Sequence, residues 1–452
     1  MSFGVGASQG IAYADRPPPV DPGQLPAGDP ARPLDKTERP GNTPCYSTQQ
    51  GGDGPAAPAP QRSLDLPHAW EFSRGEGQLV AVIDTGVARH PRLPDLEAGG
   101  DFVADGGDGV SEDCDAHGTV VAGIIAAKPQ AGQGFSGVAP EARILSIRQT
   151  SALYDYANRQ DRKPEDPPRG YGRVDALAAA IRRAADRHAS VINISLVSCV
   201  PNGVSFSDGA VGAAVRYATL EMDAVVVAAA GNTDDKCKAS NPGIDPLKPT
   251  DDPWNHVTTN VTPARYDDYV LSVGSIDQNG APSSFTVPGP WVGVAAPGED
   301  IVSLDPRGTG TITGKYDNQS LVPLKGTSFA APYVSGVVAL VRAHFPELRA
   351  LDVIKRIQAT AHAPGEGWNP YVGYGAIDPV AALTAEVPKA LPPKRPAAAQ
   401  SVQLQVPSPA PPPDNRARNV ALIGSGSVAA LLILGMLASF PIRRRFGVRE
   451  ER

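Results

Sequence analysis

Three polar residues stand where a chain could assemble a nucleophile. Ser328 lies in GTSFAAPYVSG (326–336), between a Gly-Thr turn and a run of small apolar residues. A serine at such a place is usually only a helix N-cap, but a strand-to-helix turn can also present its oxygen beside the positive end of the helix dipole. His117 opens the apolar stretch GTVVAGIIAA, and Asp84 ends the apolar run QLVAVID.

These residue types are the parts needed for acyl transfer. A serine hydroxyl is a weak nucleophile at neutral pH, so it needs a base to take its proton, and an imidazole base needs a carboxylate to fix its tautomer. Ser328, His117 and Asp84 supply the three parts. They follow one another in the order Asp, His, Ser, which is one of the known orders of the convergent triad.

The elements that must position them alternate along residues 63–386. Buried strands are predicted at 78–84, 142–148, 191–196, 224–232 and 269–276, and helices at 118–127, 174–187 and 328–345. Strand and helix in turn predict an α/β domain with a mostly parallel sheet flanked by helices on both faces. Chemistry in such a sheet gathers at the carboxyl ends of the strands, which is where Asp84 stands.

Segments of different composition flank and interrupt this domain. Residues 15–62 are rich in Pro and Gly and have no periodic apolar face, so they are interpreted as an extension rather than a folded prodomain. A proline-rich linker is predicted at 387–419. Two insertions, 150–173 and 233–268, are long enough to be functional or disordered loops.

Composition excludes some function classes. The 452-residue chain carries a formal net charge of -7, so no nucleic-acid partner is expected, because such partners need a basic face. The cysteines show no C-x-x-C pair or Cys/His ligand spacing, and we expect no zinc site. They are Cys45, Cys114, Cys199 and Cys237. No cofactor or metal is predicted, and the thiols are either free or joined in disulfides.

A membrane segment is predicted near the C-terminus. Residues 420–440 carry no charge and are long enough for a helix to cross a hydrocarbon core of about 30 Å; a buried core helix is the alternative. The basic tail, 441–452, indicates a cytoplasmic C-terminus, with the bulk of the chain outside the plasma membrane. Residues 1–14 fit either the end of a truncated signal peptide or a disordered Gly-rich start. Export would favour disulfides.

Four motifs, in order, resemble those of the subtilisin-like serine proteases: VIDTGV, HGTVVAGIIA, VVVAAAGN and GTSFAAPYVSGVVAL. The resemblance covers residues 63–386. It implies that Asp84 orients His117, that His117 is the general base and acid, and that Ser328 forms an acyl-enzyme. It also implies that Asn232, at the end of AAAGN, donates its side-chain amide to the oxyanion.

The same resemblance implies a substrate-binding strand at Ser195, Leu196 and Val197, which pairs with an extended peptide through its backbone. Many relatives have glycine where Val197 stands. A branched side chain there should narrow the pocket for the residue that precedes the scissile bond. We therefore expect a preference for a small residue at that position.

The plan of the whole chain is similar to that of the mycosins, membrane-anchored subtilases associated with type VII secretion systems. The resemblance implies an extracytoplasmic, periplasmic-side protease, anchored in the lipid bilayer, that cleaves secreted proteins. It also implies contacts with subunits of the secretion membrane complex. The alternative is mainly a structural subunit of that complex, in which proteolysis is secondary.

The resemblance further suggests disulfides between Cys45 and Cys114 and between Cys199 and Cys237, although four cysteines allow three pairings. The first bond would fasten the extension beside His117, so that the extension either clasps the domain or partly occludes the cleft. Relatives often bind structural calcium, but the sequence contains no carboxylate loop clear enough to assign.

Overall fold

The computed structural model describes residues 16–41, 43–163, 166–167, 170–233, 237, 241–245, 247–248, 250–394 and 414–445. The chain divides into two units, Met1–Ala398 and Ala399–Arg452. The predicted signal segment, 1–14, lies outside the described residues.

A seven-stranded sheet forms the centre of the first unit, and all its neighbouring strands run parallel. In spatial order the strands are β12 (Val292–Pro297), β11 (Val270–Ile276), β9 (Val225–Ala229), β7 (Val191–Ile194), β3 (Leu79–Asp84), β5 (Arg143–Arg148) and β4 (Leu96–Asp101). The five predicted strands are the inner five, which confirms the predicted sheet. The two outer strands were not predicted.

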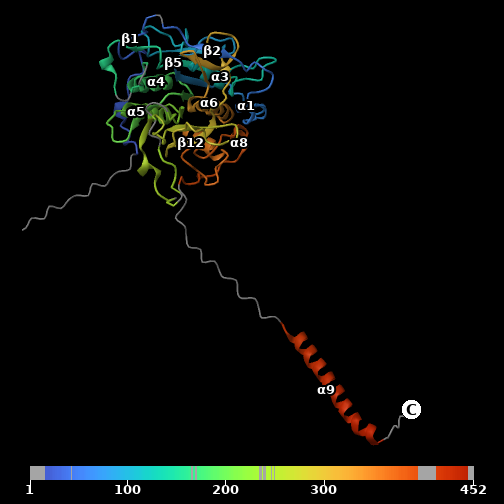
Figure 1. The fold of residues 1–452 in the computed structure, drawn as a ribbon. Coiled ribbons are helices and arrows are strands. Elements are labelled where there is room, and N and C mark those ends of the chain that lie inside the picture. Colours follow the sequence, from blue (N-terminus) through green and yellow to red (C-terminus); the bar gives the residue numbers. More distant parts are fainter. Residues whose placement is uncertain are drawn as a thin grey trace, which may run out of the picture. The chain divides into compact units, whose positions relative to one another are not determined.

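Helices cover both faces of the sheet (Figure 1). They are α1 (Ala59–Arg62), α2 (Leu66–Ala69), α3 (Gly118–Ala126), α4 (Val174–Asp186), α5 (Gly209–Arg216), α6 (Thr327–His344), α7 (Ala350–Ala359) and α8 (Pro379–Thr384), with short turns of helix at η1 (Pro22–Gln24), η2 (Arg159–Asp161), η3 (Tyr217–Glu221) and η5 (Pro253–His256).

The central strand β3 shows why its sequence is apolar without interruption. Val80 and Val82 pack into the core that contains α3 and α6, whereas Ala81 and Ile83 pack into the core that contains α4 and α5. Because side chains of a strand alternate between the faces, a strand covered on both sides needs an apolar residue at every position. This arrangement places α3 and α6 side by side on one face.

The N-terminal extension packs onto the domain as strands. Its β1 pairs antiparallel with β6 of the first insertion, and its β2 pairs antiparallel with β14. Two sheets have two strands each: β1 (Thr37–Glu38) with β6 (Asp155–Tyr156), and β8 (Ser198–Pro201) with β10 (Thr259–Thr262). A four-stranded sheet contains β2 (Ser47–Gln50), β13 (Ser303–Leu304), β14 (Thr311–Asp317) and β15 (Ser320–Pro323).

The predicted linker differs from the structure at both ends. At its start, Lys394 donates to the Asp267 carboxylate at 2.6 Å and to the Pro290 carbonyl at 2.8 Å, so residues up to 394 pack on the first unit. At its end, α9 (Arg416–Arg445) begins before residue 420.

Within α9, the stretch Arg416–Ser439 is long and apolar enough to cross a membrane. Its side chains are exposed rather than buried in protein. A helix of this length with apolar residues exposed on all sides fits a membrane span better than the alternative of a buried core helix.

Candidate active site

Asp84 is the last residue of β3 and is completely buried. Its Oδ1 accepts a hydrogen bond from the Thr85 backbone N–H at 2.7 Å and another from Nδ1 of His117 at 2.7 Å. A buried carboxylate held in this way can fix both the tautomer and the orientation of the imidazole.

His117 immediately precedes α3, with its side chain 20% exposed. A Cβ at Gly118 would lie 2.0 Å from the carbonyl oxygen of Gly86. Only glycine therefore lets the start of α3 approach the turn that follows β3, and this close approach brings the His117 ring to Asp84. The Phe329 ring packs against the imidazole with the centroids 4.9 Å apart.

Ser328 is the second residue of α6, and its Oγ lies 3.1 Å from Nε2 of His117. The preceding Gly326 has φ +147°, in the region that favours glycine. A Cβ at Gly326 would lie 3.1 Å from Ser328 Oγ and 3.2 Å from Nδ2 of Asn232. The glycine thus leaves open the space between the hydroxyl and the amide.

Asn232 follows β9, and its side-chain amide is oriented by Thr327. Its Oδ1 accepts from the Thr327 backbone N–H and from the Thr327 hydroxyl, each at 3.0 Å. The Nδ2 group makes no hydrogen bond to a described residue and faces the space beside Ser328 Oγ. Thr327 was not predicted as a site residue; its only signal is its place between Gly326 and Ser328.

The predicted substrate strand, Ser195 to Val197, lies outside regular secondary structure. Leu196 and Val197 are partly exposed, whereas Ser195 is only 4% exposed. The Ser195 hydroxyl donates to the main-chain carbonyl of Ser328 at 2.7 Å. The Ser195 side chain is thus occupied by the Ser328 backbone, whereas the predicted pairing with a peptide uses main-chain groups of the segment.

Both disulfides are the expected pairs, Cys45–Cys114 and Cys199–Cys237. Among the described residues, the one group with the spacing of metal ligands is Cys45, Glu112 and Cys114. Its two sulfur atoms are bonded to each other, so they offer no thiolate to a metal.

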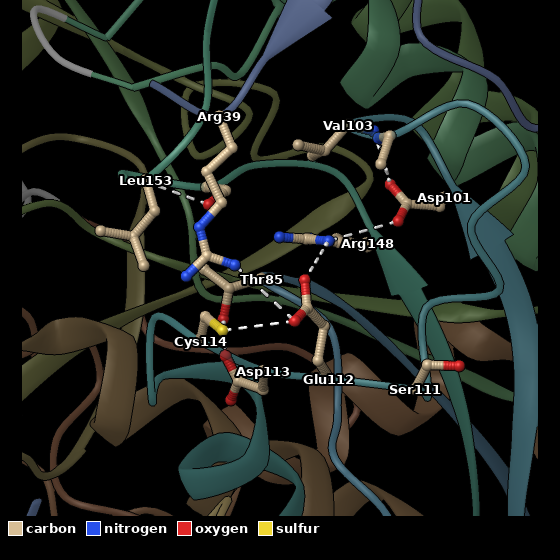
Figure 2. Close-up of polar contacts among 12 residues, drawn as sticks. Arg39, Thr85, Asp101, Val103, Ser111, Glu112, Asp113, Cys114, Arg148 and Leu153 are labelled. Atoms are coloured by element: carbon tan, nitrogen blue, oxygen red, sulfur yellow. Dashed lines mark hydrogen bonds and ion pairs between the residues drawn. The ribbon is translucent and has the colours of Figure 1, made fainter. Parts of the chain in front are cut away.

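Figure 2 shows Glu112 beside Cys114, between two guanidinium groups. Glu112 lies 3.8 Å from Arg39 of the extension and 3.7 Å from Arg148 at the end of β5. Arg148 is 3% exposed and also pairs with Asp101 at 3.4 Å. These ion pairs, with the disulfide, join the extension to the segment that leads into His117.

Asp113, which the sequence did not single out, supports the start of α3. It accepts from the Thr85 hydroxyl and from the Thr119 backbone N–H, both at 2.8 Å, and Thr85 Oγ1 accepts from Gly118 N–H at 2.9 Å. Burial, opposed by the Thr119 hydrogen bond and reinforced by the neighbouring Asp115, raises the pKa of Asp113 to about 6.

Comparison with known proteins agrees with this geometry. The family model for peptidase S8, the subtilase family, matches residues 75–375. The chain belongs to the subtilase family. It is a subtilisin-type serine endopeptidase with a subtilisin-like fold, as expected from its motifs.

Among full-length relatives, this subtilase is 45% identical to Mycosin-4 of Mycobacterium tuberculosis (strain ATCC 25618 / H37Rv), over 97% of this chain and 93% of that protein. It matches the solved structure of MycP1, a serine protease and essential component of the type VII (ESX-1) secretion system, with 44% identity and a TM-score of 0.76 over 82% of this chain and all of that one.

A third match is a chain of the intact ESX-5 inner membrane complex, with 44% identity and a TM-score of 0.77. It covers 94% of this chain and 99% of that one. The subtilase is therefore mycosin-like along nearly its whole length, including the segments outside the protease domain.

Proposed function

We propose that this chain is a membrane-anchored endopeptidase of a type VII secretion system that cleaves secreted proteins through an acyl-enzyme. The observation that carries the proposal is the continuous hydrogen-bonded chain from Asp84 through His117 to Ser328, with the Asn232 amide beside it. Asp84 ends β3, His117 precedes α3, Ser328 lies in the first turn of α6 and Asn232 follows β9, so the sheet and the two helices packed on it bring them together.

The chemistry follows from the positions of the atoms. His117 Nε2 takes the proton of Ser328 as Oγ attacks the scissile carbonyl, and Asp84 stabilises the imidazolium. The oxyanion that forms receives a hydrogen bond from Asn232 Nδ2. His117 then gives its proton to the leaving amine, and an activated water releases the acyl group by the same steps in reverse.

The remaining segments indicate where the protein would lie in the cell. Residues 420–440 would cross the plasma membrane, the basic tail 441–452 would lie in the cytoplasm, and the protease domain, 63–386, would lie on the periplasmic side. The match with a chain of the ESX-5 inner membrane complex supports secretion-complex subunits as partners of this protein.

The same match favours a second candidate, in which the protein is mainly a structural subunit of the complex. Comparing a Ser328→Ala variant with complete deletion separates the two. If Ser328→Ala preserves the complex on a native gel but abolishes cleavage of secreted proteins, the enzyme proposal stands. If the variant preserves both secretion and processing, and deletion alone removes them, the structural role is the main one.

A further inference from the structure

The main-chain carbonyl of Ser328 lacks the usual α-helical hydrogen-bond donor four residues further along the chain. Within an α-helix it would accept from the N–H of the residue four positions on, and that residue is Pro332, inside α6. Proline has no N–H. The sequence GTSFAAP therefore leaves the carbonyl of Ser328 available at the partly buried start of α6.

Ser195 satisfies that carbonyl from the neighbouring strand end. Its hydroxyl donates to the Ser328 oxygen at 2.7 Å, and its side chain is 4% exposed. A backbone oxygen buried without a partner would be costly, so the Ser195 hydroxyl replaces the bond that Pro332 removes.

Two further side chains fix the direction of the Ser195 hydroxyl. Asn193 Nδ2 donates to Ser195 Oγ at 2.9 Å, and Asn193 Oδ1 accepts from the Ser335 hydroxyl at 2.8 Å. Asn193 and Ser335 are completely buried. Because Ser195 Oγ already accepts from Asn193, its own hydrogen is directed to the Ser328 carbonyl.

We propose that Ser195 is a positioning residue for the nucleophile, which it ties to the end of β7 through the carbonyl of Ser328. The inference rests on the proposed catalytic role of Ser328. On the other side, Thr327 is tied to Asn232, so the first turn of α6 is held from two strand ends. A small displacement of a nucleophile from its reactive position strongly lowers the reaction rate.

The test uses the full-length protein in detergent and two phosphonate probes. An alkyl fluorophosphonate reports the reactivity of Ser328 alone, and a peptidyl phosphonate also needs the substrate-binding strand. We expect Ser195→Ala to react about tenfold more slowly with both probes, and Ser195→Thr, which keeps the hydroxyl, to recover most of the rate.

Ser146→Ala is the matched control. Ser146 is a completely buried serine whose hydroxyl donates to the Gly109 carbonyl at 2.7 Å, away from Ser328. Loss of that bond should destabilise the fold to a similar degree while changing both labelling rates less than about twofold. Rates are compared per folded molecule, with circular dichroism and thermal unfolding as the check.

A double-mutant cycle tests the role of Pro332. Pro332→Ala supplies the missing N–H, so Ser195→Ala should slow labelling much less in that background than in the wild type. Equal effects in both backgrounds would contradict the inference. If Ser195→Ala does not fold, Ser335→Ala is the second variant. It removes only the hydroxyl that donates to Asn193, and it should still slow labelling by both probes about threefold.

The outcomes separate this inference from the proposed function. If wild-type Ser328 is not labelled, both fail. If Ser328 is labelled equally fast in Ser195→Ala and wild type, only the positioning role is wrong. If Ser195→Ala slows the peptidyl probe alone, Ser195 serves substrate binding and the positioning role is again wrong.

Discussion

At the scale of single residues, local sequence predicts the candidate catalytic residues but not the residues that hold them in place. The motif residues Asp84, His117 and Ser328 stand beside glycines and strand ends that mark them in the chain. Asp113 and Thr327 carry no such mark, because their roles depend on hydrogen bonds to segments far away in the sequence. Ser195 is predicted to pair with substrate through its backbone, and the sequence did not indicate that its side chain contacts the Ser328 carbonyl.

Asn232→Ala should lower kcat by on the order of 10² to 10³ and change KM little, since the amide meets charge only in the transition state. That range is the one known for the corresponding donor of a subtilisin. The measurement is steady-state kinetics on a peptide selected from a library. An unchanged kcat would remove Asn232 from the oxyanion site.

Val197→Ala, and to a greater extent Val197→Gly, should widen the pocket for the residue before the scissile bond. The enzyme should then accept larger residues at that position. The Val197 side chain packs against the cluster that contains Cys199 and Trp254, so it is fixed where it would limit the pocket. Cleavage profiling of a peptide library with both variants tests this. A wild-type enzyme that prefers large aromatic residues there would contradict the expectation.

Asp113→Asn should make the free energy of unfolding depend less on pH in the acid range. The pKa of Asp113 is raised from 3.8 to about 6 in the fold, so the folded state binds a proton more tightly and loses stability as the pH rises from about 4 to 6. The variant lacks this contribution. Urea unfolding across that range measures it, and an equal decline in both proteins would show that Asp113 is not its source.

At the scale of elements, the inner strands were predictable and the edges were not. The run LVAVID of β3 is apolar throughout because both faces are covered. The edge strand β4, LEAGGD, carries glycines and acidic residues, so it has no strand pattern. The extension has little apolar sequence of its own because its strands pair with strands of the domain, β1 with β6 and β2 with β14.

We expect the extension to fasten onto the domain as a clasp and not to occlude the active-site cleft. In the described part of the chain, its hydrogen bonds to the domain include those to Val103, Cys114 and Asp305, and none reaches Asp84, His117 or Ser328. Replacing Cys45 and Cys114 together by serine should therefore cost stability, about 4 kcal/mol on the chain-entropy estimate for a sequence separation of 69, and leave the labelling rate of Ser328 unchanged.

Thermal unfolding and labelling of the double Cys→Ser variant test the clasp together. The matched control is the second bond, Cys199–Cys237, replaced in the same way. Faster labelling of Ser328 after loss of the Cys45–Cys114 bond alone would mean that the extension occludes the cleft.

At the scale of the whole molecule, a subtilase domain and a single apolar helix share one chain. The similarity to mycosins extends over both, as the 97% coverage shows. Under the proposed function, α9 would hold the protease domain at the bilayer, where it would meet proteins during or after their export.

The most direct test of the account treats the full-length protein, wild type and Ser328→Ala, with a fluorophosphonate and locates the adduct by mass spectrometry. The account predicts one adduct, on Ser328, that is absent from the variant. A folded wild-type protein that remains unlabelled, or that carries the adduct elsewhere, would contradict the proposal that Asp84, His117 and Ser328 form a working catalytic site.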